Sequence, residues 1–342
     1  MKARSSLFIS LLALLPFAAS AFDDALIAAA RKEGKVVFYS SAAIEATQKI
    51  CQGFERTYSG VKCEFYRATA LPLFQRFNTE MESKNIKADV IHASSVPGFL
   101  NARDKGWLAK YKSPEGAKYL PQFKDKEGYF VAARVIPVGI AYNNKIVSAA
   151  EAPKTWKDVL DPKWKGKLIA ADPGASGTGL MAFYYWEKTF GLDFIRQLAQ
   201  NAPMVVGSTA PAANAVAAGE RPVAAMMDSW EVVMRVHKDL PIAINFPKEG
   251  VPVAPSPVAV VAGSPNPNAA QLLMHYMISK EGQQVIMDDV GAYSGRPDMP
   301  PLKNMPKLTD LKLVDIDWVA LQSAQSQAVD TYSKILKEGA AK

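Results

Sequence analysis

A glycine-rich segment that runs into an apolar one, 172-DPGASGTGLMAFYYW-186, contains residue types that could do chemistry. Glycines and small hydroxyl side chains ahead of a helix can cradle an anion on backbone N–H groups, bind a dinucleotide, or simply turn the chain. The adjacent Tyr184 and Tyr185 could hold a ferric ion or fill a core. These alternatives make different demands on the surrounding residues.

Spacing argues against two of the alternatives. A dinucleotide loop requires an acidic residue about 20 positions further on, at the end of the next strand. Gln197 stands near that position, and the next apolar segment, residues 204–206, ends without an acid. Adjacent residues of a helix point about 100° apart, so Tyr184 and Tyr185 cannot both face one site. The tyrosines are therefore interpreted as core residues, and the loop before them remains the candidate for function.

The sequence gives little support for catalysis. His92, His237 and His275 are far apart and show no metal-ligand spacing. There is no G-x-S-x-G elbow, no H-E-x-x-H pair and no G-x-x-x-x-G-K-[ST] loop. We therefore expect neither an enzyme nor a bound cofactor or metal ion.

An alternation of strands and helices must position the candidate residues. Strands are predicted at residues 36–39, 88–93, 134–143, 167–172, 222–228, 241–246 and 257–263, with helical windows between them. This pattern predicts an α/β fold with largely parallel sheets. In such sheets, ligands bind where loops and helix N-termini gather at the carboxyl ends of strands. Five such loops carry hydroxyl groups: Ser40-Ser41, Ser94-Ser95, residues 175–179, Ser208-Thr209 and Asp228-Ser229-Trp230.

The chain is longer than one core usually supports, which predicts two lobes. Residues 130–143 and 250–261 are long extended segments whose prolines prevent full pairing, and they are interpreted as two crossings between the lobes. One lobe then comprises residues 22–132 plus 257–342, and the other residues 133–256. A single continuous sheet with prolines at its edge is the alternative.

The N-terminus has the form of a signal peptide over residues 1–21. A basic start, an apolar run and the small residues 19-ASA-21 predict cleavage and export to the periplasm. In that oxidising compartment, Cys51 and Cys63 are expected to form a disulfide. Without the leader, 38 basic and 33 acidic residues remain, a net charge of +5. Because these charges are scattered, no nucleic-acid partner is expected.

Four landmarks occur in a characteristic order: 152-APKTWKDVLDPKWKGKL-168, 216-VAAGERPVAAMM-227, 255-PSPVAVVAGSPNPNAAQLLMHYMISKEGQ-283 and 295-GRPDM-299. With them, the chain resembles the periplasmic solute-binding proteins of ABC importers, in the extracellular solute-binding family that includes the ferric-ion-binding proteins. The resemblance implies a two-lobed type II periplasmic binding protein with two hinge-crossing strands. It also implies a partner, an ABC transporter permease in the inner membrane.

The resemblance places the ferric ligands of the family, a histidine, a glutamate and a tyrosine pair, at positions occupied here by Ala43, Ser94, Ser229 and Trp230. These side chains lack the hard anionic oxygens that ferric iron prefers. The family's pocket for a synergistic anion falls on Ser176-Gly177-Thr178, with a polar residue near Thr209. A ferric iron-binding protein is therefore kept as the alternative.

We predict a periplasmic binding protein that captures a small organic anion, namely a phosphonate, phosphate ester or carboxylate, by lobe closure. The N–H groups of Ser176 to Thr178 would hold the anionic head, assisted by the helix dipole. Asp228 could pair with an ammonium group, and Trp230 could stack on the solute. Each serine could instead cap a helix, and Trp230 could be a core residue. A periplasmic enzyme is a remote alternative. The predicted ligand-binding residues are Ser40, Ser41, Ser94, Ser95, Ser176, Gly177, Thr178, Ser208, Thr209, Asp228, Ser229 and Trp230.

Overall fold

The computed structural model describes residues 18–340 of the chain. The predicted signal peptide, residues 1–21, therefore lies outside the described residues except for its last four, which begin helix α1 (Ala18–Glu33). Within the described range, none of the helices has the length and apolar content that crossing a bilayer requires.

A long twisted sheet runs through the molecule, with the strand order β2-β1-β3-β9-β4-β7-β5-β6. Its parallel pairs are β1 with β2 and β3, and β5 with β6 and β7. The short strands β8 and β10 pair with β4 and β9 off this path. The strands are β1 (Lys35–Ser40), β2 (Lys62–Arg67), β3 (Val90–His92), β4 (Val131–Tyr142), β5 (Leu168–Ala171), β6 (Met204–Val206), β7 (Val223–Asp228), β8 (Ala243–Asn245), β9 (Val251–Val260) and β10 (Leu313–Val314).

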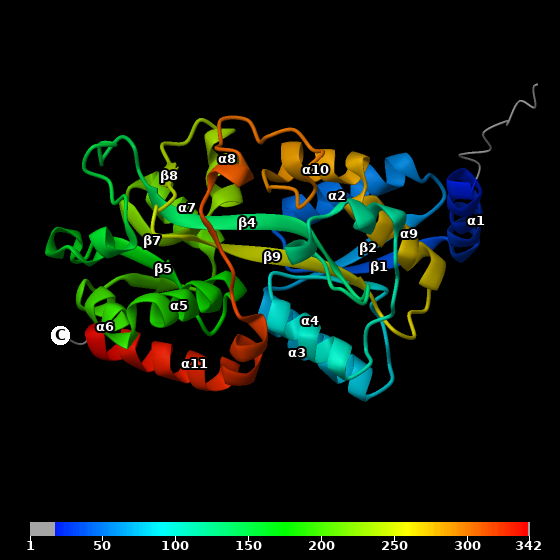
Figure 1. Cartoon of the computed structure of the whole chain (residues 1–342), viewed down its shortest axis with the longest axis horizontal. Coiled ribbons are helices and arrows are strands. Elements are labelled where there is room, and N and C mark those ends of the chain that lie inside the picture. The colour runs from blue at the N-terminus through cyan, green and yellow to red at the C-terminus, as the bar shows by residue number, and fades with distance from the viewer. Residues whose placement is uncertain (1–17, 341–342) are drawn as a thin grey trace, which may run out of the picture.

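Strands β4 and β9 join the two halves of the sheet (Figure 1). They run antiparallel to each other, and β4 pairs with β9 along its first half and with β7 along its second. Every residue of β4 is buried. The paired region includes Pro137 on β4 and Pro255 and Pro257 on β9, and each removes an N–H donor from the ladder. These two strands coincide with the extended segments predicted at residues 130–143 and 250–261.

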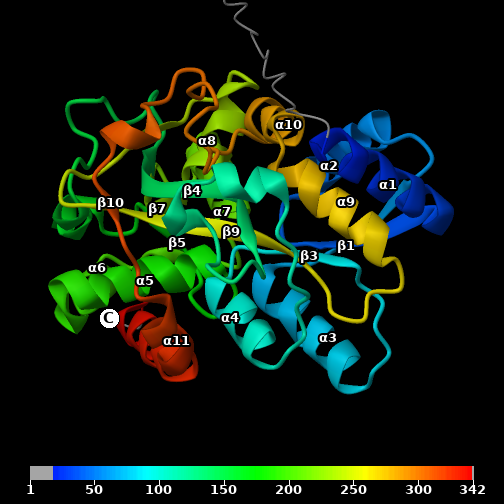
Figure 2. The ribbon, with the colours of Figure 1, turned by 45° about the vertical axis from the view of Figure 1, so that its right-hand side comes forward.

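Helices cover both faces of the sheet (Figures 1 and 2). In Figure 1, α3, α4, α5, α6 and α11 lie below the strands, and α2, α8 and α10 lie above them. Figure 2 shows α9 on the same side as α2 and α10. The helices after α1 are α2 (Ile44–Thr57), α3 (Ala70–Glu82), α4 (Val96–Asp104), α5 (Gly177–Phe190), α6 (Leu192–Gln200), α7 (Thr209–Ala218), α8 (Ser229–Val236), α9 (Pro267–Ile278), α10 (Lys280–Val290) and α11 (Trp318–Ala340).

Helix α11 contacts both halves of the molecule. It packs against α5 and α6 along most of its length and against α4 near its start (Figure 2). The predicted lobe boundaries placed it with residues 257–342 in the first lobe, whereas α5 and α6 fall in the predicted second lobe. These boundaries stay a prediction.

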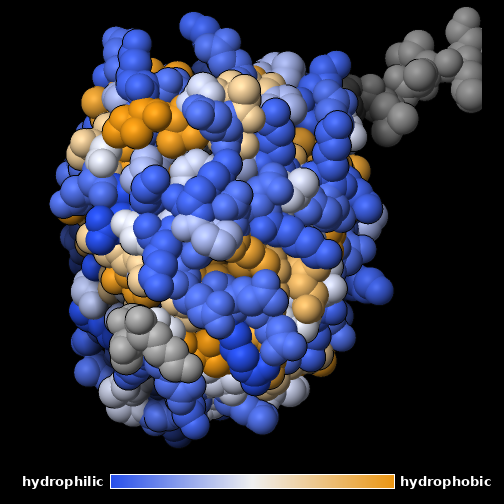
Figure 3. All heavy atoms as spheres, turned by 90° about the vertical axis from the view of Figure 1, so that its left-hand side faces the viewer, coloured by the Kyte–Doolittle hydropathy of each residue, from blue (hydrophilic) through white to orange (hydrophobic). Residues whose placement is uncertain are grey.

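The tyrosine pair belongs to the core, as predicted. Tyr184 and Tyr185 are both buried on α5, and Tyr185 packs edge-on against Trp156. Cys51 and Cys63 form a disulfide between α2 and β2. On the face shown in Figure 3, hydrophobic residues appear only as separate patches among hydrophilic ones. Most of the large hydrophobic side chains of the described residues are buried.

Candidate functional site

A small polar cavity of about 60 Å³ lies where the two halves of the sheet meet. One wall comes from the loops after β1 and β3 and the start of α3, and the other from the N-termini of α5, α7 and α8. The structure brings nine of the twelve predicted ligand-binding residues to this cavity: Ser41, Ser94, Ser176, Gly177, Thr178, Ser208, Thr209, Asp228 and Trp230.

The other three predicted residues do not line the cavity. Ser40 is fully buried and bonds to the backbone and to neighbouring side chains. Ser95 caps α4, because its Oγ accepts from the N–H of Gly98 at 3.3 Å. Ser229 is fully buried, with its Oγ lacking a hydrogen-bond partner. For Ser95 the helix-cap alternative therefore holds.

The start of α5 offers fewer free N–H groups than predicted. Ser176 is the cap residue, and its Oγ accepts from the N–H of Gly179 at 3.1 Å. Its own N–H, expected to bind the anion, donates to the carbonyl of Asp172 at 2.9 Å. The N–H groups of Gly177 and Thr178 remain, since the first turn of a helix provides no carbonyl acceptors for them. These two N–H groups, together with the positive end of the helix dipole, favour a negatively charged group at the start of α5.

Arg134 is the principal cavity residue that the sequence reasoning missed. It lies on β4 with only 1% of its surface exposed. Its Nε donates to His92 Nε2 at 3.3 Å and its Nη2 to Ser256 Oγ at 3.1 Å, while the buried Nη1 has no partner. Burial lowers the pKa of Arg134 to about 10, so the guanidinium stays charged at neutral pH. The available signal was one arginine inside the apolar run 130-FVAARVIPVGIAY-142, because arginine is rarely buried without a partner.

His92 holds that guanidinium in place as a neutral group. Its Nε2 receives the Nε–H of Arg134, which leaves the ring proton for Nδ1, next to Ser40 Oγ at 3.3 Å. Complete burial, with a smaller contribution from Arg134, keeps the pKa of His92 well below its usual value. The orientation of the arginine therefore depends on residues behind the cavity wall.

Two carboxylates line the same cavity. Asp228 is 5% exposed, its Oδ2 accepts from Thr209 Oγ1 at 2.7 Å and Thr178 Oγ1 at 3.4 Å, and its Oδ1 has no partner. Burial raises the pKa of Asp228. Glu231, also missed from sequence, is paired with Arg235, yet burial outweighs this pairing and raises its pKa to about 7.

Trp230 and Arg67 complete the charged and aromatic lining. The Trp230 ring lies 5.7 Å from the guanidinium carbon of Arg134, within cation–π range. Arg67, at the end of β2, was not predicted and donates from Nε to the carbonyl of Ala42. Cationic side chains, carboxylates and helix N-termini therefore line the same small cavity.

The two walls touch at Gly177. A Cβ placed on this glycine would lie 1.9 Å from the carbonyl oxygen of Ser94, which comes from the opposite wall. Ser94 is itself fixed, because its N–H donates to Ser41 Oγ at 3.1 Å and its Oγ donates to Ser256 Oγ at 3.2 Å. The cavity is therefore closed on this side by a contact that only glycine permits.

The positions where the resemblance places ferric ligands are partly at the cavity. Ala43, Ser94 and Trp230 line it, and Ser229 does not. Over residues 18–340, no three His, Cys, Asp or Glu side chains gather in a way that could hold a metal ion.

Comparison with known proteins gives a consistent family and fold. A family model described as bacterial extracellular solute-binding protein matches residues 85–323. The chain is 28% identical over 230 residues to a putative 2-aminoethylphosphonate-binding periplasmic protein of Salmonella typhimurium, covering 64% of this chain and 66% of that protein.

Two solved structures show the same architecture. Periplasmic AfuA from Actinobacillus pleuropneumoniae, with exogenous fructose-6-phosphate bound, superposes with a TM-score of 0.81 at 25% identity, covering 89% of this chain and 99% of AfuA. Iron-bound HitA from Pseudomonas aeruginosa gives 0.77 at 21%, covering 88% and 99%. These likenesses confirm the predicted type II periplasmic binding protein fold.

Proposed function

The chain belongs to the bacterial extracellular solute-binding protein family, and from this premise we propose that it captures a small organic anion in the periplasm for an ABC importer. The anion would be a phosphonate, phosphate ester or carboxylate. Relatives described as periplasmic binding proteins for an aminoethylphosphonate and of an ABC transporter support this role.

The observation that carries the proposal is the unpartnered Nη1 of Arg134. A buried polar group without a partner costs roughly 1–3 kcal/mol, and a charged one costs more. An anion in the cavity would receive this charge-assisted hydrogen bond together with the N–H groups of Gly177 and Thr178. Anion binding would then recover the free energy that the protein loses by keeping Arg134 unpaired.

Closure of the two walls would complete the capture. A ligand shifts a protein toward the conformation in which it makes more contacts. Here the anion would contact Arg134 on β4, the α5 N-terminus on one wall, and Ser41 or Ser94 on the other. The closed form, with Gly177 against Ser94, would be the one that a permease recognises.

Ferric iron is the weaker candidate for this cavity. Of the two carboxylates that line the cavity, Glu231 is already paired with Arg235, so only Asp228 keeps a free oxygen. The unpaired charge of Arg134 would also repel a trivalent cation. The test therefore compares ferric salts with the organic anions.

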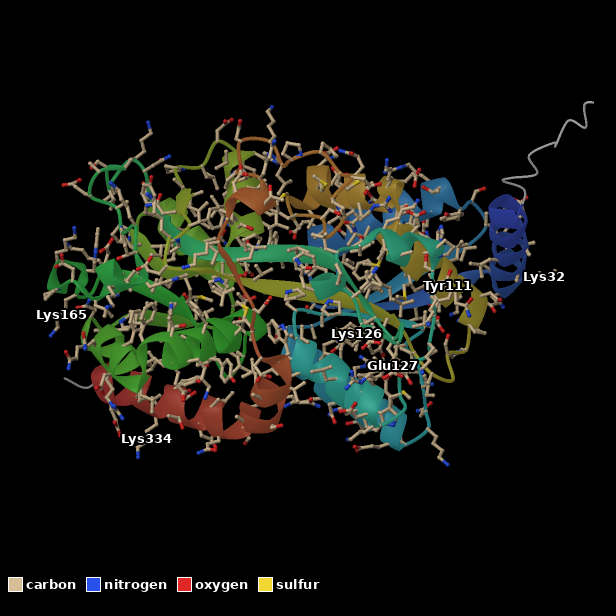
Figure 4. The ribbon with its side chains drawn as sticks, viewed as in Figure 1. Lys32, Tyr111, Lys126, Glu127, Lys165 and Lys334 are labelled. Atoms are coloured by element: carbon tan, nitrogen blue, oxygen red, sulfur yellow. A yellow bond between two sulfur atoms is a disulfide. The ribbon has the colours of Figure 1, made fainter. Side chains whose placement is uncertain are left out.

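A thermal-shift experiment on the purified protein tests the proposal. Phosphonates, phosphate esters and carboxylates are compared with ferric salts, with and without carbonate. A ligand that binds only the folded state raises the melting temperature in proportion to RT ln(1 + [L]/Kd). We expect a shift with at least one organic anion, and the same shift in a Lys165→Gln control, because Lys165 is exposed at the edge of the molecule, far from the cavity (Figure 4). A shift with iron alone would overturn the proposal.

A further inference from the structure

Asp228 lines the cavity, and its carboxylate does not cap its own helix. It is the residue just before α8, where an aspartate usually accepts hydrogen bonds from the N–H groups of the first turn. No such bond forms here. The hydroxyls of Thr209 and Thr178 hold Oδ2, and Oδ1 is buried without a partner. The carboxylate is thus fixed with one oxygen unused.

Arg134 forms no hydrogen bond or ion pair with this carboxylate, although the two opposite charges attract each other. Two of its nitrogens are engaged by His92 and Ser256, and the third has no partner. Two residues that line the cavity therefore carry one unpartnered cationic nitrogen and one unpartnered anionic oxygen, which are not bonded to each other. Both groups are almost completely buried, so each carries a desolvation cost that a complementary ligand group would offset.

We propose that Asp228 is a subsite for an amine, so that the solute is a short zwitterion with anionic oxygens at Arg134 and the α5 N-terminus and an ammonium group at Asp228. This inference rests on the proposed function, which supplies the anionic half of the solute. A plain anion would bring its charge beside the unpaired oxygen of Asp228, which would repel it. An ammonium group removes that repulsion and satisfies Oδ1.

The size of the cavity restricts the solute further. About 60 Å³ corresponds to roughly four to six water-sized groups. A chain of two carbons between an oxyanion and an amine is closer to this size than a hexose phosphate, which is considerably larger. Trp230, beside Arg134, would then cover the short carbon chain.

Three phosphonates of nearly equal shape test the subsite by calorimetry: 2-aminoethylphosphonate, 2-hydroxyethylphosphonate and propylphosphonate. They differ only in whether an ammonium, a hydroxyl or a methyl group reaches Asp228. We expect the amine to bind at least about tenfold more tightly than the other two, the size of one charge-assisted hydrogen bond. In Asp228→Asn, which retains an oxygen for the two threonines, the preference for the amine should vanish while the other phosphonates bind equally well or better.

The results separate this inference from the function on which it rests. Equal binding of the amine and hydroxyl compounds by the unmodified protein would overturn the amine subsite but leave anion capture intact. Binding of a sugar phosphate without any of the three phosphonates would do the same. Only the absence of binding by every organic anion would overturn the proposed function as well. Since the series is measured on the unmodified protein, the outcome does not depend on Asp228→Asn folding.

Discussion

Gly177 and Ser94 meet across the cavity, at a distance that leaves no room for a side chain on the glycine. The two residues come from opposite walls and are 83 positions apart in the sequence. In the proposed lobe closure this contact would form only when the walls are closed, and it can be perturbed without substituting any charged group of the cavity.

Replacing Gly177 by alanine should hold the walls apart. The Cβ would lie 1.9 Å from the Ser94 carbonyl, so the closed form would be destabilised while the open form is not. We expect anion affinity to fall by at least about tenfold, in proportion to the lost closed population. Calorimetry measures the affinity, and small-angle scattering the compaction on binding. Gly207→Ala is the matched control, because a Cβ there meets nothing within 4 Å. Unchanged affinity in Gly177→Ala would show that closure does not require this contact.

Replacing Arg134 by glutamine should weaken anion binding by about ten- to a hundredfold, the range for hydrogen bonds to charged groups. The stability of the unliganded protein should change little, because the substitution removes a buried charge together with the attraction of that charge to Asp228 and Glu231. Arg134→Lys, which keeps the charge without the bonds to His92 and Ser256, should bind with intermediate affinity. Calorimetry and urea denaturation measure the two quantities separately. A large loss of stability with little loss of affinity would assign Arg134 a structural role.

The stability of the protein should depend on the protonation of Glu231. Burial raises the pKa of Glu231 from 4.5 to about 7, so the folded state binds this proton more tightly than the unfolded chain does. Its contribution to the free energy of unfolding is then fully present below pH 4.5 and is lost as the pH rises through about 7. Glu231→Gln lacks this dependence, so its stability relative to the unmodified protein should increase toward high pH by on the order of 1–3 kcal/mol.

Urea denaturation at several pH values measures this difference. The comparison with Glu231→Gln is necessary because His92 acts in the opposite direction: its pKa is lowered on folding, so its contribution is lost as the pH falls. Both proteins retain His92, and its effect cancels in the difference. A difference that does not change with pH would contradict the raised pKa of Glu231.

Removing the disulfide should destabilise the protein by about 3 kcal/mol, the value for a closed loop of similar length. Cys51 and Cys63 are separated by 12 positions and tie α2 to β2. The double variant Cys51→Ala/Cys63→Ala, compared with the oxidised and reduced protein in urea, isolates this contribution. If the reduced protein and the oxidised protein unfold at the same urea concentration, the crosslink does not contribute to stability.

Sequence reasoning found the buried strands and missed three others, namely β2 and β6 at the edges of the sheet and the two-residue β10. The strand predicted at residues 167–172 corresponds to β5, which is buried throughout and reads as a continuous apolar run. Strand β2 begins with charged and apolar residues in alternation, which is typical of a half-buried strand, and the sequence analysis missed this short signal. Strand β6 is three residues long, at the other edge of the sheet.

The sequence likewise predicted only part of the site. Loops that follow strands indicated where most cavity residues would lie, because topology alone brings these loops together. Whether Arg134 has a free nitrogen depends on His92 and Ser256, which lie 42 and 122 positions away. The state of Asp228 depends in the same way on Thr178, 50 positions earlier. Such pairing is decided by tertiary packing, which no local pattern records.

The position of Arg134 on β4, a strand shared by both halves of the sheet, has a kinetic consequence. A group beside the bending axis moves little when the halves separate, so its charge faces an incoming solute before closure as well as after it. The association rate should therefore decrease with ionic strength, because long-range attraction acts on the encounter. The dissociation rate should depend on the Gly177–Ser94 contact, which in the proposed mechanism would form only on closure. The association rate and the dissociation rate would thus be governed by different residues and could be changed separately.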